Sequence, residues 1–243
     1  MADNVWLSAV EPLIIAHRGA SAHATENSLD ACALAVDHAA DGVEVDVQLT
    51  RDGRVVLMHD ATLTRLTGSS RKVSELSLAE LRDERLPDGQ HIPLLEDLFE
   101  TFGDLLLYNL ELKDFGLRDR GLVDSVAEIV ARYKLGEQIL VSSFNPLQVR
   151  RAGHSFPRSV AVALLRAPGL LRYTRFFVHA AVDNPHSSLV DKAYAEWAAT
   201  KGLRSFIWTI DDAEEARRVL SLGVNGLITN DPARLRAELA LPA

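Results

Sequence analysis

The sequence predicts an α/β fold, a (β/α)8 barrel distorted by one antiparallel strand. Three observations favour it. Apolar segments of strand length alternate with amphipathic helical segments along the 243-residue chain, as in a parallel sheet covered by helices. The chain length is within the range of such a barrel. Charged residues and histidines follow several predicted strands, and this edge of an α/β sheet usually carries the functional groups.

Nine segments have the composition of strands: residues 13–17, 42–49, 55–59, 105–113, 139–144, 160–165, 178–183, 205–210 and 226–229. Only residues 51–54 separate residues 47–50, around the end of the second segment, from the third. That connection is too short for a parallel crossover, so these two segments should form an antiparallel hairpin. Pairing around the turn would place Asp46 opposite His59. A (β/α)8 TIM barrel with one antiparallel strand therefore fits the pattern.

Helices are expected where capping residues precede amphipathic segments. Such signals occur at Asn27 (before a helix over 28–39), Ser77, Asn145, Ser188, Asp211 and Asp231. Asn145 and Asp231 are each followed by proline, which suits the first position of a helix. Residues 61–90 are polar and look like a small insertion packed over the barrel mouth. We therefore predict one domain over residues 1–243.

The bulk composition limits the function. The chain has 34 acidic and 26 basic residues and a net charge of −8, which argues against binding to nucleic acid or to anionic lipid surfaces. Its single cysteine, Cys32, excludes an internal disulfide and is expected in the core. No signal peptide or membrane span is evident, so we expect a cytoplasmic protein, a monomer or a homodimer.

Three carboxylates are candidate metal ligands. Glu44 and Asp46 are two positions apart, so they share one face of a strand. In a barrel the valines between them must face the helices, which turns the acids inward. Glu111 repeats the pattern on a later strand. Two inward carboxylates cannot both stay ionised without a cation or a proton between them, and hard oxygen ligands suit Mg²⁺ or Ca²⁺.

Other polar residues end the same strands. His17 and His59 each close a strand beside a charged residue, and the pKa of histidine suits proton transfer near neutral pH. Arg18 offers a planar fork for a phosphate, and Lys113 can meet an anionic oxygen. Gly19 should allow a tight turn. These residue types together indicate metal-assisted chemistry on a phosphate ester.

Late in the chain, Asn184, His186 and Trp208 are possible substrate-lining residues, with Trp208 as an aromatic wall. A core role for Trp208 is nearly as favourable. Arg166, Arg172 and Arg175 fall within one loop, and we expect them to be solvated.

An ordered set of motifs resembles the glycerophosphodiester phosphodiesterase family over almost the whole chain. The matching segments are His17-Arg18-Gly19, Glu26-Asn27-Ser28, residues 44–53, His59-Asp60, residues 64–68 and 92–96, residues 109–113, Ser143-Phe144, Trp208-Thr209 and residues 226–229. The chain has Thr25 and Ala40 where the family usually has proline and glycine. These two differences remove no functional group.

The resemblance implies a divalent cation held by Glu44, Asp46 and Glu111. It also implies acid–base catalysis by His17 and His59, with Arg18 and Lys113 on the phosphate. The reaction would convert a glycerophosphodiester to glycerol 3-phosphate and an alcohol. The sequence does not choose among choline, ethanolamine, glycerol and inositol as that alcohol, nor between Mg²⁺ and Ca²⁺.

Two alternatives are open. A lysophospholipase D-like activity on lysolipids would need an apolar tunnel, which Leu170, Leu171, Phe176 and Phe177 can supply. A non-catalytic phosphate-binding module would be expected to lack some of the acid–base or metal residues, and none is missing.

Overall fold

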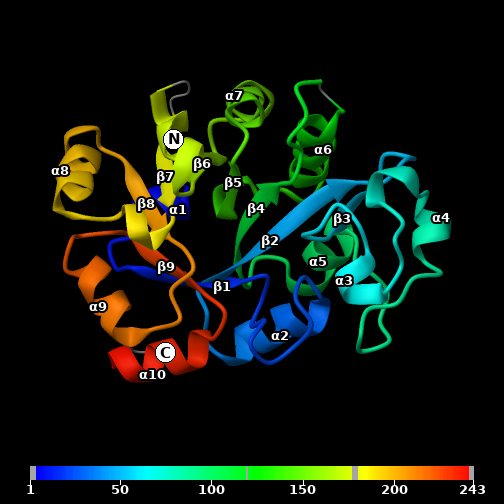
Figure 1. Cartoon of the computed structure of the whole chain (residues 1–243), viewed down its shortest axis with the longest axis horizontal. Helices are drawn as coiled ribbons and strands as arrows, with labels where there is room; N and C mark the ends of the chain where they lie inside the picture. Colours follow the sequence, from blue (N-terminus) through cyan, green and yellow to red (C-terminus); the bar gives the residue numbers. More distant parts are fainter. Residues whose placement is uncertain (1–3, 119, 177–179, 241–243) are drawn as a thin grey trace.

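A sheet of nine strands organises the computed structural model, which describes residues 4–118, 120–176 and 180–240 (Figure 1). The strands are β1 Leu13–His17, β2 Gly42–Leu49, β3 Val55–Leu57, β4 Leu107–Leu112, β5 Ile139–Ser143, β6 Ala161–Arg166, β7 Val182–Pro185, β8 Arg204–Ile207 and β9 Gly226–Thr229. All nine overlap the predicted segments, although part of the predicted segment 178–183 lies outside the described residues. Residue 105 was predicted as buried strand, but Leu105 precedes β4 and is 69% exposed.

Eight parallel strands close into a barrel in the order β1-β9-β8-β7-β6-β5-β4-β2, with β2 pairing back to β1. The antiparallel strand β3 pairs with β2 outside this ring, so the prediction that it distorts the barrel was wrong. The cause is the length of β2. Its first half pairs with β1 as far as Glu44, and its second half extends beyond β1, where Val47 pairs with Leu57 of β3.

The β2–β3 hairpin is antiparallel as predicted, but its register differs by one residue. Thr50 already pairs with Arg54, so the loop has three residues and ends at Gly53, whose φ of 79° a glycine adopts readily. The Met58 amide consequently donates to the Asp46 carbonyl oxygen at 2.9 Å. His59 lies one residue beyond the position opposite Asp46 that the sequence predicted.

Apart from α1 (Val5–Ser8), whose Trp6 packs against Phe206 of the barrel interior, helices cover the outside of the barrel or lie beside β3 (Figure 1). The others are α2 Leu29–Asp37, α3 Thr64–Thr67, α4 Leu78–Leu81, α5 Leu95–Phe102, α6 Leu122–Tyr133, α7 Pro146–Ser155, α8 Lys192–Thr200, α9 Ala213–Leu220 and α10 Pro232–Leu239. Short 3₁₀ segments are η1 Val73–Glu75, η2 Gly136–Gln138, η3 Gly169–Phe176 and η4 Ser187–Leu189. Between β6 and β7, the described residues contain η3 in place of an α-helix.

Three of the predicted helix starts are confirmed. Ser77 forms a reciprocal capping box with Glu80, and Asn145 and Asp231 cap α7 and α10 ahead of proline. Each side-chain oxygen accepts a hydrogen bond from an amide in the first turn, which would otherwise lack a partner. At these three positions the side-chain oxygen bonds the helix amide as the sequence predicts.

The other three starts were assigned to the wrong residue. Ser28, Asp191 and Asp212 cap α2, α8 and α9, in place of the predicted Asn27, Ser188 and Asp211. The side chain of Asn27 bonds Asp46, and that of Asp211 bonds Thr229 and Asn230. Both side chains therefore bond residues near the candidate site and do not cap a helix.

Two apolar layers fix the direction of the β2 side chains. Val43, Val45 and Val47 belong to the core between the sheet and the helices, whereas Leu13, Ile15, Leu107, Leu140, Phe206 and Ile228 belong to the cluster inside the barrel. Because strand residues alternate, Glu44 and Asp46 face the barrel interior as predicted, 4% and 0% exposed. Cys32 is buried in the outer core, also as predicted.

Residues 61–90 lie beside the barrel next to β3, where α3 and α4 are visible in Figure 1. Leu63, Val73, Leu76, Leu81 and Leu86 form a small core there with Val56 and Met58. No helix among the described residues is long and apolar enough to cross a membrane.

Candidate active site

A cavity of about 180 Å³ opens at the carboxyl ends of the barrel strands. Its walls are His17, Arg18, Glu44, His59, Asn109, Glu111, Lys113, Phe144, Leu165, Trp208, Thr209 and Ile228. Seven of the ten predicted site residues are among them. Asp46 lies at the floor of the same region, and Asn184 and His186 do not line the cavity.

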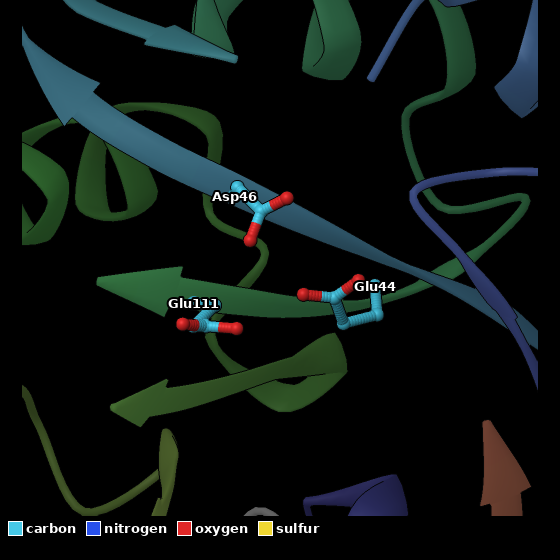
Figure 2. Close-up of side chains that lie close together, drawn as sticks. All are labelled: Glu44, Asp46 and Glu111. Atoms are coloured by element: carbon cyan, nitrogen blue, oxygen red, sulfur yellow. The ribbon is translucent and has the colours of Figure 1, made fainter. Parts of the chain in front are cut away.

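Three carboxylates point toward one another in this region (Figure 2). Glu44 and Asp46 come from β2, and Glu111 lies opposite Asp46 on the neighbouring strand β4. Each offers an oxygen, and these oxygens lie within 4.8 Å of one another. The pKa of Glu44 is raised well above its usual value, first by burial and then by the charges of Asp46 and Glu111. The pKa of Glu111 is raised to about 7, first by burial and then by the charge of Asp46.

Two cations offset part of this charge. The Lys113 ammonium is 2.7 Å from Glu111 Oε1 and 3.1 Å from Asp46 Oδ1, and Arg18 Nε is 3.2 Å from Asp46 Oδ2. Burial alone would raise the pKa of Asp46. Lys113 and Arg18 outweigh it and hold that pKa below its usual value. Asp46 is thus the carboxylate that stays ionised most readily.

The carboxylate group fits a divalent cation. Its three members supply hard oxygen ligands on two adjacent strands, and the burial of all three creates a demand for positive charge. The buried Asp46 Oδ1 accepts no hydrogen bond. It has the Lys113 ammonium as an ion-pair partner at 3.1 Å but no hydrogen bond, so this oxygen keeps capacity for a metal ion.

The turn after β1 brings Arg18 to the cavity. Arg18 and Gly19 both have positive φ values, 57° and 79°. A Cβ atom on Gly19 would lie 2.6 Å from Ala31 of α2, so only glycine fits this close approach. The Arg18 guanidinium then reaches Glu26 at 2.9 Å as well as Asp46, as the predicted tight turn requires.

A chain of polar contacts orients His17. Its Nδ1 lies 2.7 Å from Asn230 Oδ1, and Asn230 Nδ2 donates to Asp211 Oδ2 at 2.5 Å. Since that amide nitrogen is the donor to Asp211, the amide oxygen faces His17 and must accept the Nδ1 proton. The lone pair of Nε2 therefore faces the cavity, 3.9 Å from Glu44 Oε2. Burial and Arg18 lower the pKa of His17.

His59 has a different partner. Its Nδ1 lies 2.7 Å from Asp60 Oδ1, and the other oxygen of Asp60 accepts from Arg65 Nε at 2.6 Å. Arg65 also forms two 2.7 Å hydrogen bonds with Glu26, the acid that contacts Arg18. One histidine is thus bonded to a neutral amide and the other to a carboxylate.

Trp208 forms part of the apolar wall. It packs edge to face against Phe144 with ring centroids 5.4 Å apart, and its Nε1 donates to the Asn184 carbonyl oxygen at 2.8 Å. His186 packs on the same indole at 5.1 Å. Asn184 and His186 therefore support Trp208 rather than line the cavity.

The three arginines of the later loop differ in environment. Arg166 is 3% exposed and bonds Asp183 through Nε at 2.7 Å and Nη2 at 2.5 Å, so the expectation of a solvated side chain was wrong for it. Its side chain leaves the outer face of β6 and stacks on Tyr194 and Trp197. Arg172 is exposed, and the side chain of Arg175 lies outside the described residues, as does Phe177.

A second cavity, about 380 Å³, adjoins the first and shares His17 and Arg18 with it. Its other walls are Ser21, Ala22, Glu26, Asp211, Asn230, Asp231 and Arg234. His17 and Arg18 therefore separate two compartments, which suits a substrate with a group on either side of a central phosphate.

Several residues around the site were not singled out from the sequence as site residues. Asn27 donates to Asp46 Oδ2 at 2.8 Å, and Asn230 and Asp60 orient the histidines. The signal for Asn230 was its position directly after the barrel strand β9, and His17 likewise lies at the end of its strand, β1. Asn27 precedes a helix and was interpreted as its cap, although its segment Glu26-Asn27-Ser28 was among those that resemble the family.

Comparison with known proteins is consistent across sequence and structure. A model of the glycerophosphoryl diester phosphodiesterase family matches residues 17–234. A glycerophosphodiester phosphodiesterase of Caldanaerobacter subterraneus subsp. tengcongensis is 33% identical over 242 residues, covering 93% of this chain and 97% of the relative. A lysophospholipase D of Rattus norvegicus is 26% identical, covering 93% of this chain and 85% of the relative.

A solved structure is similar over the same length. The phosphodiesterase of Oleispira antarctica, in complex with the product sn-glycerol-3-phosphate, superimposes with a TM-score of 0.80 at 26% identity. The match covers 95% of this chain and 97% of the other.

Proposed function

Because the chain belongs to the glycerophosphoryl diester phosphodiesterase family, we propose that it hydrolyses glycerophosphodiesters to glycerol 3-phosphate and an alcohol. One P–O bond to the alcohol breaks, and water supplies the elements of the two products. The observation that carries the proposal is the shared cavity, which brings two differently paired histidines beside three metal-capable carboxylates. The reaction catalysed by this site is phosphoric diester hydrolysis.

Glu44, Asp46 and Glu111 would hold the cation, Mg²⁺ or Ca²⁺. When bound, it would polarise the phosphodiester and offset the charge that develops on the phosphoryl oxygens. The protein's own residues supply the remaining chemistry.

His17 is the proposed general base. Asn230 fixes its Nδ1 as a donor, which leaves Nε2 free to accept a proton. Burial and the neighbouring Arg18 lower its pKa, so the ring is neutral near pH 7. It would take a proton from the nucleophile, which is either water or the glycerol hydroxyl next to the phosphate; the second route passes through a cyclic phosphate that ³¹P NMR would detect.

His59 is the proposed general acid. Its Nδ1 bonds the Asp60 carboxylate at 2.7 Å, which orients the ring and leaves Nε2 for proton transfer. Arg65 in turn keeps Asp60 ionised: burial acts to raise the pKa of Asp60, but the contacts with His59 and Arg65 lower it. His59 would protonate the departing alcohol oxygen.

Arg18 and Lys113 are the proposed phosphate ligands. Both line the cavity, and both also contact Asp46, so their positions are fixed before substrate arrives. Arg18 supplies a planar fork for two phosphate oxygens, whereas Lys113 supplies a compact charge.

A second candidate substrate is a lysolipid. It is favoured by the rat lysophospholipase D among the relatives and by the apolar wall of Phe144, Leu165 and Trp208. The reaction would be the same diester cleavage with an acyl chain on the glycerol. Choline release from lysophosphatidylcholine, compared with that from glycerophosphocholine, distinguishes the two substrates.

The test of the proposal is product identity. Incubation with glycerophosphocholine should release glycerol 3-phosphate and choline in equal amounts. Release of phosphocholine and glycerol would place the cleavage on the wrong side of the phosphorus and contradict the proposal. Glu137→Gln, on an exposed residue remote from the cavity, is the matched control for site variants.

A further inference from the structure

Large apolar side chains are exposed on one side of the cavity mouth. Of the eleven that the described residues expose, six lie on the segments after β4, β5 and β6. We call these six the apolar rim: Phe115 (66% exposed), Leu117 (83%), Leu147 (37%), Leu170 (88%), Leu171 (38%) and Tyr173 (50%). The other five are in α1, at the end of α2, or just before β1 and β4, toward the opposite end of the barrel.

The three segments begin at the cavity itself. Lys113, Phe144 and Leu165 line it, and the chain continues from each of them into the apolar rim. Two of the segments are also bonded to each other. Asn145 Nδ2 donates to the Asp114 and Gly116 carbonyl oxygens at 2.9 and 3.1 Å, which ties the start of α7 to the segment after β4. In Figure 1, α7 stands between α6 and β6.

The same segments are locally basic. Arg118, Arg120, Arg150 and Arg172 are exposed there; of the two acids in residues 114–121, 144–150 and 167–174, Asp114 is buried and Asp119 lies outside the described residues. The net charge of −8 therefore comes from other parts of the surface. Arg172 stacks on Tyr173 with its guanidinium 5.3 Å from the ring centroid, so charge and apolar surface are interleaved.

We propose that the apolar rim docks on an anionic lipid surface. Exposed leucines and aromatic rings flanked by arginines match the acyl boundary and the phosphate groups of such a surface. An isolated apolar residue at a surface is ordinary, but six exposed ones on three segments that start at one cavity favour an interaction site. The arginines select a lipid surface over a second copy of the chain, whose own rim would carry the same positive charge. The docking itself does not depend on the proposed function. Only its consequence, that docking would present diesters to the cavity, rests on the proposed function.

The test is co-sedimentation of the full chain with vesicles, in chelator to exclude metal bridging. The wild type should bind vesicles of phosphatidylcholine mixed with phosphatidylglycerol, and less well those of phosphatidylcholine alone. Leu117→Ser with Leu170→Ser should weaken binding about tenfold or more, whereas Val10→Ser with Leu105→Ser, equally exposed at the other end, should not. Arg118→Glu with Arg120→Glu should weaken binding by at least roughly fivefold for each arginine, and Arg132→Glu with Arg158→Glu should not.

Three results would overturn the proposal: no binding by the wild type, equal loss in the control pairs, or a rim variant that changes only the oligomeric state. Hydrolysis of water-soluble glycerophosphocholine, measured in parallel, separates this proposal from the function. Vesicle binding without hydrolysis would contradict the function alone. Unchanged hydrolysis without vesicle binding would contradict the docking alone.

Discussion

Glu44 and Asp46 are neighbours on one strand face, yet their pKa values shift in opposite directions. Both are buried, but Asp46 has Lys113 and Arg18 beside it, and Glu44 has mainly other acids. The metal-free site therefore favours ionisation of Asp46 and retention of a proton on Glu44. A divalent cation would allow all three carboxylates to ionise together.

Glu44→Gln tests this charge arrangement at a single residue. It should reduce metal-dependent turnover at least about 100-fold, because the variant loses a charged oxygen ligand. The metal-free protein should be no less stable, since a buried carboxyl with a raised pKa has been removed. Steady-state kinetics and thermal unfolding measure the two effects. Near-normal turnover in a folded variant would remove Glu44 from the metal site.

Asn230→Ala tests the orientation of His17. Without the amide oxygen, the Nδ1 proton loses its acceptor and the ring is free to rotate or change tautomer. We expect kcat to fall about 10- to 100-fold with little change in KM, because the phosphate ligands are untouched. Ser21→Ala removes a 3.0 Å hydrogen bond to the same oxygen and a 2.7 Å hydrogen bond to the His17 carbonyl oxygen. It leaves the Asn230 acceptor in place, so it should have a much smaller effect. A change confined to KM would contradict the orienting role.

At the scale of elements, turns and strand ends set the site. The turn after β1 is a sharp case, because Gly19 and Gly53 both have a φ of 79° but differ in their surroundings. Gly19 approaches Ala31, whereas no atom lies within 4 Å of a Cβ on Gly53. Comparing alanine substitutions at these two glycines therefore separates the cost of backbone strain from the cost of steric overlap.

Gly53→Ala should cost about 1–2 kcal/mol of unfolding free energy, from the left-handed backbone alone. Gly19→Ala should cost about 1–3 kcal/mol more because of the clash, and it should also impair turnover by displacing His17 and Arg18. Denaturant unfolding measures both free energies. Equal costs for the two variants would show that the close approach to Ala31 is unimportant.

The pairing of β2 with β4 makes stability depend on pH. The pKa of Glu111 is about 7 in the folded protein against an ordinary 4.5. Between these values the unfolded chain ionises while the folded protein keeps its proton. The contribution of Glu111 to unfolding free energy therefore falls as pH rises from about 4.5 to about 7, by on the order of 3 kcal/mol. Below 4.5 both states are protonated, and the penalty is absent.

Subtracting the profile of Glu111→Gln isolates this contribution. The wild type should lose stability relative to the variant across that pH window, and the loss should level off above it. Added divalent cation should stabilise the wild type most above pH 7, where it offsets the full penalty. Parallel pH profiles for the two proteins would contradict the raised pKa.

Much of the fold and of the candidate site could be predicted from strand periodicity. The alternation in β2 was sufficient to turn Glu44 and Asp46 inward, and the same reasoning placed Glu111 beside them. Residues that act through another side chain were harder to predict, because their sequence pattern is already explained by a local role such as capping a helix. Asn27 and Asp211 resemble helix caps, and only the folded chain shows that Asp46 and Asn230 compete for them. The position of β3 likewise depends on how far β2 extends beyond β1.

Over the whole molecule, the barrel converts separate strand ends into one site. His17 and His59 are 42 positions apart in the sequence, and Trp208 is still more distant, yet all three line a single cavity. The surface charge is also distributed by the fold, since a chain of net charge −8 presents arginines beside that cavity. Net charge alone did not predict this segregation.

The most direct test of the account is release of glycerol 3-phosphate from glycerophosphocholine by the intact chain. The assay is run in excess chelator and again after Mg²⁺ or Ca²⁺ is restored, with Glu44→Gln and Glu137→Gln in parallel. The account predicts turnover that chelator abolishes and one cation restores in the wild type and in Glu137→Gln, but not in Glu44→Gln. Turnover that persists in chelator, or that a folded Glu44→Gln retains, would contradict it.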